Sequence, residues 1–163
     1  MSAHRFEAVE AAGGRVIVGR LLPGTDLIEG IEAICDKYQI AYAAISFAYG
    51  SLASAGFKYL QVPEPGARAV LTPHTVDKRV EFLAGQGLVC EGDTGRAVHI
   101  HGAVSDETGA VMGGHFERGQ NPVYNNMDVT LVELKGVRLI RRWDAETQTV
   151  EMVVEQLSGE ESA

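Results

Sequence analysis

The stretch Val98-His99-Ile100-His101 alternates apolar and polar residues, which is typical of a β-strand with one face turned towards a core. On such a strand, His99 and His101 project from the same face. A second stretch, Gly113-Gly114-His115, adds a third imidazole after two glycines, where the backbone is free to bend or to approach a neighbour closely. If the two stretches form adjacent strands, three of the chain's five histidines converge on one point.

The residues between these two stretches favour a hairpin. Residues 97–105 and 110–116 have the pattern of strands, and residues 106–109 are Asp, Glu, Thr and Gly, which are typical of a tight turn. In this hairpin His99, His101 and His115 all lie far from the turn. That placement favours their convergence.

Three converging imidazoles predict a metal site. Neutral imidazole is a common ligand of transition metals, and three nitrogens leave a fourth position open, as in a catalytic or ligand-binding site. We therefore expect a transition metal on His99, His101 and His115. The pattern has an alternative explanation, in which the histidines are polar residues of a solvated face or donate hydrogen bonds to backbone carbonyls.

The composition predicts one ordinary domain. The chain has 163 residues, of which 45% are hydrophobic. It contains no apolar run long enough to span a bilayer, and residues 1–10 have no signal-peptide core, so a cytoplasmic protein with no membrane partner is expected. Cys35 and Cys90 form no Cys-x-x-Cys pair, and both are expected to be reduced.

The charge disfavours binding to nucleic acid. The formal net charge is −8, from 14 basic and 22 acidic residues, whereas binding to a polyanion depends on neutralising phosphates. The densest basic segments, residues 78–79 and 138–142, are expected to be ordinary solvated charges. The chain also lacks Gly-x-Gly-x-x-Gly and Gly-Lys-Ser/Thr motifs, which disfavours dinucleotide and phosphate-loop sites.

The rest of the chain predicts a single α+β domain over residues 15–155. Asp26, with Glu29 three residues later, forms a capping box for an amphipathic helix over residues 26–38. Residues 1–14 are expected to be a flexible arm, residues 156–163 a disordered tail, and residues 63–77 a surface loop that carries His74, a further possible ligand. We expect one main helix packed on a mixed sheet of about seven strands, an α/β-type single domain. The segments with a strand pattern, counted as seven to nine strands, are 15–22, 41–49, 52–62, 78–89, 97–105, 110–116, 127–134, 137–143 and 149–155, with a turn at 90–96 and a loop at 117–126.

This order of motifs resembles the plants and prokaryotes conserved, or PPC, domain. The motifs are Pro23-Gly24-Thr25-Asp26-Leu27 before the helix, Gly50-Ser51-Leu52, Arg79-Val80-Glu81-Phe82-Leu83, His99-Ile100-His101 and Gly109-Ala110-Val111-Met112-Gly113-Gly114-His115. The resemblance covers roughly residues 15 to 155. It departs from the family's Gly-Arg-Phe-Glu-Ile-Leu signature at Lys78 and Val80.

The resemblance implies a fold, an assembly and a ligand. In plants the domain follows AT-hooks in nuclear DNA-binding proteins, and in bacteria and archaea it stands alone. It implies a single domain with a sheet of about seven strands, a homotrimer, and, in the stand-alone prokaryotic members, a divalent metal, with zinc as the first candidate, on three histidines that match His99, His101 and His115. This chain has no AT-hook, so the DNA-binding role is not carried over.

Three functional hypotheses follow. The first is a metal-dependent binding protein or hydrolytic enzyme, with water or a small-molecule or anion ligand at the open position and Glu81 or Glu91 as candidate general base. The second is a regulatory trimer that binds DNA or another protein without catalysis. The third is a structural role for the histidines, for instance at a subunit interface. The sequence leaves open whether the protein is an enzyme.

Overall fold

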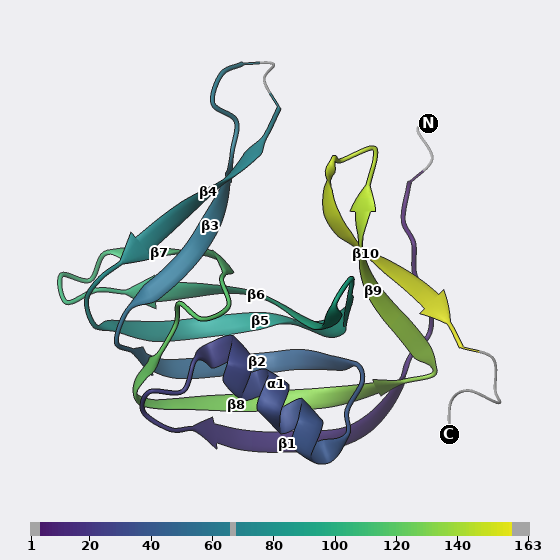
Figure 1. The fold of residues 1–163 in the computed structure, drawn as a ribbon, viewed down its shortest axis with the longest axis horizontal. Coiled ribbons are helices and arrows are strands. Elements are labelled where there is room, and N and C mark those ends of the chain that lie inside the picture. Colours follow the sequence, from purple (N-terminus) through teal and green to yellow (C-terminus); the bar gives the residue numbers. More distant parts are fainter. Residues whose placement is uncertain (1–3, 66–67, 158–163) are drawn as a thin grey trace.

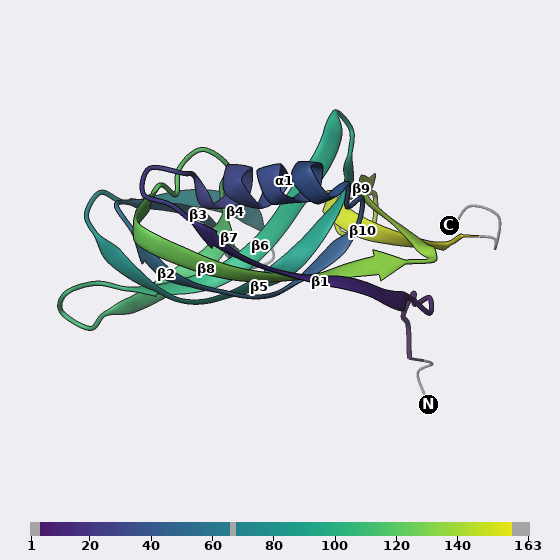
Figure 2. The ribbon, with the colours of Figure 1, turned by 90° about the horizontal axis from the view of Figure 1, so that it is seen from below.

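The structure, a computed structural model, describes residues 4–65 and 68–157. In this part of the chain a single helix lies along one face of a curved sheet of ten strands (Figure 1, Figure 2). The strands are β1 (Ala12–Leu21), β2 (Ala43–Leu52), β3 (Ala55–Gln61), β4 (Val70–Val76), β5 (Val80–Gly92), β6 (Gly95–Ser105), β7 (Val111–Phe116), β8 (Val123–Lys135), β9 (Val137–Asp144) and β10 (Thr149–Gln156), and the helix is α1 (Leu27–Tyr38).

The helix begins where the sequence predicts. The carboxylate of Asp26 accepts hydrogen bonds from the backbone nitrogens of Ile28 and Glu29, at 3.0 and 3.1 Å. The second half of the capping box does not form, because the Glu29 side chain instead pairs with Arg118 at 2.9 Å. The described helix has 12 residues, and no helix in this part of the chain is long and apolar enough to cross a membrane.

The main core lies between α1 and the sheet. Leu27, Ile31 and Cys35 of the helix are fully buried against apolar side chains of the strands. On β6, Ile100 and Val104 face this core. Because side chains alternate along a strand, the histidines of β6 project from the opposite face, away from α1. The same alternation that builds the core therefore places the candidate ligands.

The sheet is larger and more antiparallel than predicted. Its strand order is β1-β8-β2-β5-β6-β7-β3-β4, with β9 paired to β5 and β10 paired to β9. Both β1 and β2 run antiparallel to β8, which lies between them, so α1 joins two strands that run in the same direction. The one parallel pairing among the described strands is a short contact between β5 and β9. The prediction of one helix on a sheet is confirmed, but the expected mixed sheet of about seven strands is wrong.

Three predicted connections are partly strand. The expected loop 63–77 contains β4, which pairs along its whole length with β3. Pro73 favoured a loop because proline has no backbone N–H to donate within a sheet. However, β4 is the edge strand of the sheet, where a missing N–H is tolerated. The expected turn 90–96 is also shorter, because β5 runs to Gly92 and β6 begins at Gly95. The predicted loop 117–126 ends early, since β8 begins at Val123.

The ends of the chain are only partly described. The expected arm includes residues 1–3 and the expected tail includes residues 158–163, which lie outside the described residues. Within the expected arm, Arg5 pairs with Glu146 at 2.7 Å, and β1 starts at Ala12. Gln156 of the expected tail ends β10.

Two hairpins stand over the face that carries the histidines. The first consists of β3 and β4 at one end of the sheet, and the second of β9 and β10 near the turn between β5 and β6 (Figure 1). A second, smaller core beneath the β9–β10 hairpin contains Cys90, Val137 and Leu139. The two hairpins form the walls of the site described next.

Candidate metal centre

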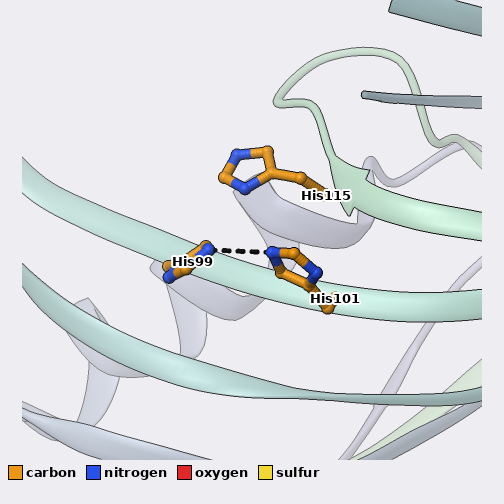
Figure 3. Close-up of side chains that lie close together, drawn as sticks. All are labelled: His99, His101 and His115. Carbon is orange, nitrogen blue, oxygen red and sulfur yellow. Dashed lines mark hydrogen bonds between the residues drawn. The ribbon is translucent and has the colours of Figure 1, made fainter. Parts of the chain in front are cut away.

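The structure brings His99, His101 and His115 together. His99 and His101 lie on β6, and His115 lies on β7 directly opposite His101 (Figure 3). The ring centroids are 4.8 to 5.3 Å apart, and one nitrogen of each ring lies within 4.8 Å of the others. The convergence inferred from the two short stretches is therefore present in the fold.

The donor set and its spacing fit a zinc ion. The Nε2 atoms of His99 and His101 are 3.1 Å apart. Two nitrogens bound to one tetrahedral zinc, each at about 2.0–2.1 Å, lie roughly 3.3 Å from each other. The group contains three imidazoles and, among the residues that the structure describes, no fourth protein ligand, which matches the composition of an open site. The residues present thus fit the predicted metal.

The turn that joins β6 to β7 and the glycines of β7 hold the three histidines in this arrangement. The Asp106 carboxylate accepts hydrogen bonds from the backbone nitrogens of Thr108 and Ala110, at 2.9 and 3.1 Å, and from the Thr108 hydroxyl at 2.6 Å. These bonds, with Lys78, hold the pKa of Asp106 well below its usual range. Gly113 allows β7 to approach β6, because a Cβ there would overlap the carbonyl oxygen of Gly102. Sequence and geometry agree that the glycines serve close packing.

The three imidazoles are neutral at physiological pH. Burial lowers the pKa of His99 to about 4, and the positive charge of Arg141 and the other two rings act in the same direction. Burial likewise lowers the pKa of His101 and of His115, although Glu117 partly opposes the effect at His115. Neutral rings keep a lone pair on one nitrogen, which is the form that binds a metal.

These lowered pKa values link the stability of the metal-free protein to pH. Between about 6.5, where an unfolded histidine titrates, and about 4 for folded His99, the unfolded chain binds more protons than the folded chain. The free energy of unfolding should therefore fall as the pH is lowered through this range. Urea denaturation in the presence of a chelator should show a steeper fall for the native protein than for His99→Gln. Equal pH dependence in the two proteins would contradict the lowered pKa.

Two charged residues that lie beside the triad were not predicted from the sequence to be part of the site. The Glu117 carboxylate lies 3.5 Å from Nε2 of His115 and pairs with Nζ of Lys58 at 2.6 Å. Arg141 of β9 donates a hydrogen bond from Nη1 to Nδ1 of His99 at 3.1 Å. The alternation His115-Phe116-Glu117 was a signal for Glu117, because it puts both polar side chains on one face. Arg141 had no such signal, since its position depends on how β9 folds back over β5.

The other candidate residues lie elsewhere. Glu91 forms a two-pronged ion pair with Arg138, at 2.7 and 2.9 Å, which lowers the pKa of this carboxyl. Glu81 faces Ser105 at the turn end of β6, away from the histidines. His74 lies on β4 with its ring 4.9 Å from that of Tyr59. In the described residues, the metal-ligand group contains none of these three.

The triad lies in the floor of a groove of about 1110 Å³. One wall comes from the β3–β4 hairpin, the other from the β9–β10 hairpin, and residues of the turn between β5 and β6 line one end. Arg68 connects the two hairpins: its guanidinium lies 5.7 Å from the centre of the Trp143 ring and donates to the carbonyl oxygen of Gln148. The site therefore has room for a ligand larger than water.

Comparisons with known proteins agree with this fold. A family model described as "Plants and Prokaryotes Conserved (PCC) domain" matches residues 8–135. A metal-containing protein from Archaeoglobus fulgidus superposes with a TM-score of 0.78 at 24% identity, over 91% of this chain and 99% of that chain. For a plant- and prokaryote-conserved (PPC) protein from Pyrococcus horikoshii, the TM-score is 0.76 at 24% identity, over 94% and 99%.

Two further similarities come from proteins with other descriptions. A candidate DNA-binding protein from Ralstonia eutropha JMP134 has a TM-score of 0.70 at 22% identity, over 85% of this chain and 90% of that chain. The bifunctional protein GlmU of Synechococcus sp. strain JA-3-3Ab is 27% identical over 157 residues, which cover 96% of this chain but 23% of that protein. The chain thus spans less than a quarter of this curated relative. At such identities the solved structures show a shared fold and no more.

Proposed function

The chain belongs to the Plants and Prokaryotes Conserved (PCC, or PPC) domain family, and we propose that it binds a divalent metal, zinc first, through His99, His101 and His115. The observation that carries this proposal is the set of three neutral imidazoles with nitrogens within 4.8 Å of one another in the floor of a groove. The metal-containing archaeal protein with the same fold adds support.

The element content of the purified protein tests this proposal. Protein purified without chelator should contain close to one equivalent of zinc per chain, because three converging imidazoles bind it tightly. Inductively coupled plasma mass spectrometry measures zinc and competing metals together. Less than about a tenth of an equivalent, with no uptake on adding zinc, would contradict the proposal.

Side chains around the triad have distinct roles in this proposal. The three histidines hold the ion, and Glu117 orients the His115 ring by facing its Nε2. A bound zinc polarises an oxygen ligand and lowers the pKa of bound water towards about 7. Hydrolysis would also need a free general base. Glu117 is already paired with Lys58 and Glu91 with Arg138, so we favour ligand binding over hydrolysis as the primary role.

We also propose that the protein assembles as a homotrimer, as the family resemblance implies. Apolar side chains on the face of β1 and β2 turned away from α1 support self-association. They are Val16, Val18, Phe47 and Tyr49, which are between 41% and 76% exposed. These residues lie on either side of β8, and exposed apolar groups on one sheet face are typical of an interface.

Light scattering should therefore give three times the chain mass of 17.5 kDa. The double variant Val18→Glu, Phe47→Glu should dissociate, because burying two carboxylates in an apolar interface is unfavourable. Leu22→Glu, at an exposed apolar residue just beyond β1, is the matched control and should keep the mass of the native protein. A monomer mass for the native protein would contradict the trimer.

We propose no nucleic-acid partner. The alternative, a regulatory DNA-associated trimer, has the description of the Ralstonia protein in its favour. The net charge of −8 and the absence of an AT-hook motif argue against it, because binding to DNA depends on phosphate neutralisation.

A further inference from the structure

We infer that the groove above the triad binds a small molecule with an oxyanion head, a carboxylate or a phosphate, on an apolar body, and that Arg141 binds the head. The inference rests on the proposed metal site. It adds the chemical class of the ligand and the residue that selects it.

Arg68 and Arg141 line the groove without an ion-pair partner among the described residues, and of these two it is Arg141 that contacts the triad. Arg141 is partly buried on β9, where Nη1 donates to His99 and Nη2 donates to the carbonyl oxygen of Val150. Its neighbours on the strand differ, since Arg138 pairs with Glu91 and Glu155, and Arg142 pairs with Glu155. Among the described residues, no carboxylate forms an ion pair with Arg141. A partly buried guanidinium without a carboxylate partner favours the binding of an anionic ligand.

The charges around the triad strengthen this preference. Lys58 already neutralises Glu117, the carboxylate beside His115. The charge of a bound divalent metal would therefore add to that of Arg141. Among the described residues, the other two carboxylates that line the groove, Asp93 and Glu151, form no ion pair with Arg141. An oxyanion placed between metal and guanidinium removes this repulsion, which is stronger in a partly buried site than in water.

The hydrogen bonds of His99 explain how metal and ligand are coupled. A guanidinium only donates, so Nδ1 of His99 accepts from Arg141, and the neutral ring then carries its proton on Nε2. For Nε2 to coordinate a metal, that proton must move to Nδ1, and Arg141 must release the ring. An oxyanion supplies Arg141 with a new acceptor. Metal and oxyanion should therefore strengthen each other's binding.

The walls of the groove suit an apolar body. Trp143 and Leu60 are each 62% exposed on opposite hairpins, and Leu71 and Val150 add further exposed apolar surface. Aromatic and aliphatic walls with a few polar groups at one end are typical of small-molecule sites. The volume of about 1110 Å³ holds an aromatic ring together with its head group.

Zinc affinity measured with and without small oxyanions tests this inference. A chromophoric chelator competes with the protein for zinc in a buffer free of coordinating anions. The affinity of this chelator for zinc is measured in each additive without protein, and the protein data are corrected with it. Benzoate and phenylphosphonate supply head and body, acetate and methylphosphonate the head alone, and benzyl alcohol the body alone. We expect benzoate or phenylphosphonate to tighten zinc binding about tenfold, the heads alone to act more weakly and benzyl alcohol to have no effect. The better of the two aromatic anions identifies the head as carboxylate or phosphate.

Two variants assign the effect to Arg141. Arg141→Met should bind zinc at least as tightly as the native protein without anion, and should lose the enhancement. Arg142→Met, on the neighbouring residue of β9, is the control and should keep it. Zinc binding that no oxyanion changes in the native protein, or full enhancement in Arg141→Met, would overturn the inference and leave the metal site standing. No zinc binding in any arm would overturn both.

Discussion

His101→Ala is expected to lower the affinity for zinc more than about a hundredfold. Loss of a residue that only orients a metal ligand costs about 10–100-fold, and loss of a ligand itself should exceed that range. His101 is an exposed side chain between His99 and His115, so its removal takes one of three nitrogens away and leaves the core intact. Isothermal titration with zinc, after removal of bound metal, measures the change.

A neighbouring substitution separates ligand loss from a general disturbance of the face. Gln86 lies directly opposite His101 on β5, is exposed and projects from the same face. Gln86→Ala should leave zinc affinity within about twofold of the native value, since an exposed substitution away from the ligands perturbs little. If His101→Ala binds zinc as tightly as Gln86→Ala, the three histidines are not the ligands, and a structural role for them becomes the better explanation.

The sequence predicts the site better than it predicts the sheet. The pairing of His101 with His115 followed from local signals, namely alternation on one strand, a short turn at 106–109 and a second strand with its own histidine. Each of these signals lies within about twenty residues. Local patterns of this kind specify a hairpin, and a hairpin by itself places the facing residues of its two strands side by side.

What the sequence could not predict depends on distant pairings. β9 lies about forty residues beyond the histidines, and only its contact with β5 brings Arg141 to His99. The groove likewise needs β3 and β4 on one side, and Pro73 concealed β4 because proline is disfavoured in strands except at an edge. The sequence suggests Glu81 and Glu91 as candidate bases because both lie near the histidine strand in strand order. Nothing local indicated that Arg138 would pair with Glu91.

The two glycines before His115 connect the fold with the site. Gly113 pairs with Ala103 and Gly114 with Gly102, in the segment of β7 that lies between β6 and β3. A Cβ on Gly113 would overlap the carbonyl oxygen of Gly102, and one on Gly114 would overlap that of Lys58. Backbone cannot give way as the end of a flexible side chain can, so β7 would have to move away from its neighbours.

Gly113→Ala should therefore weaken the fold and the metal site together. Overpacking of this kind costs about 1–3 kcal/mol, and the shift of β7 moves His115 away from His101, so zinc affinity should fall as well. Urea denaturation of the metal-free protein measures the first effect, and zinc titration the second. Gly13→Ala on β1 is the control, because a Cβ there meets nothing within 4 Å, and it should change stability by less than about 0.5 kcal/mol. A stable Gly113→Ala protein with native zinc affinity would show that the close approach of β6 and β7 does not position the ligands.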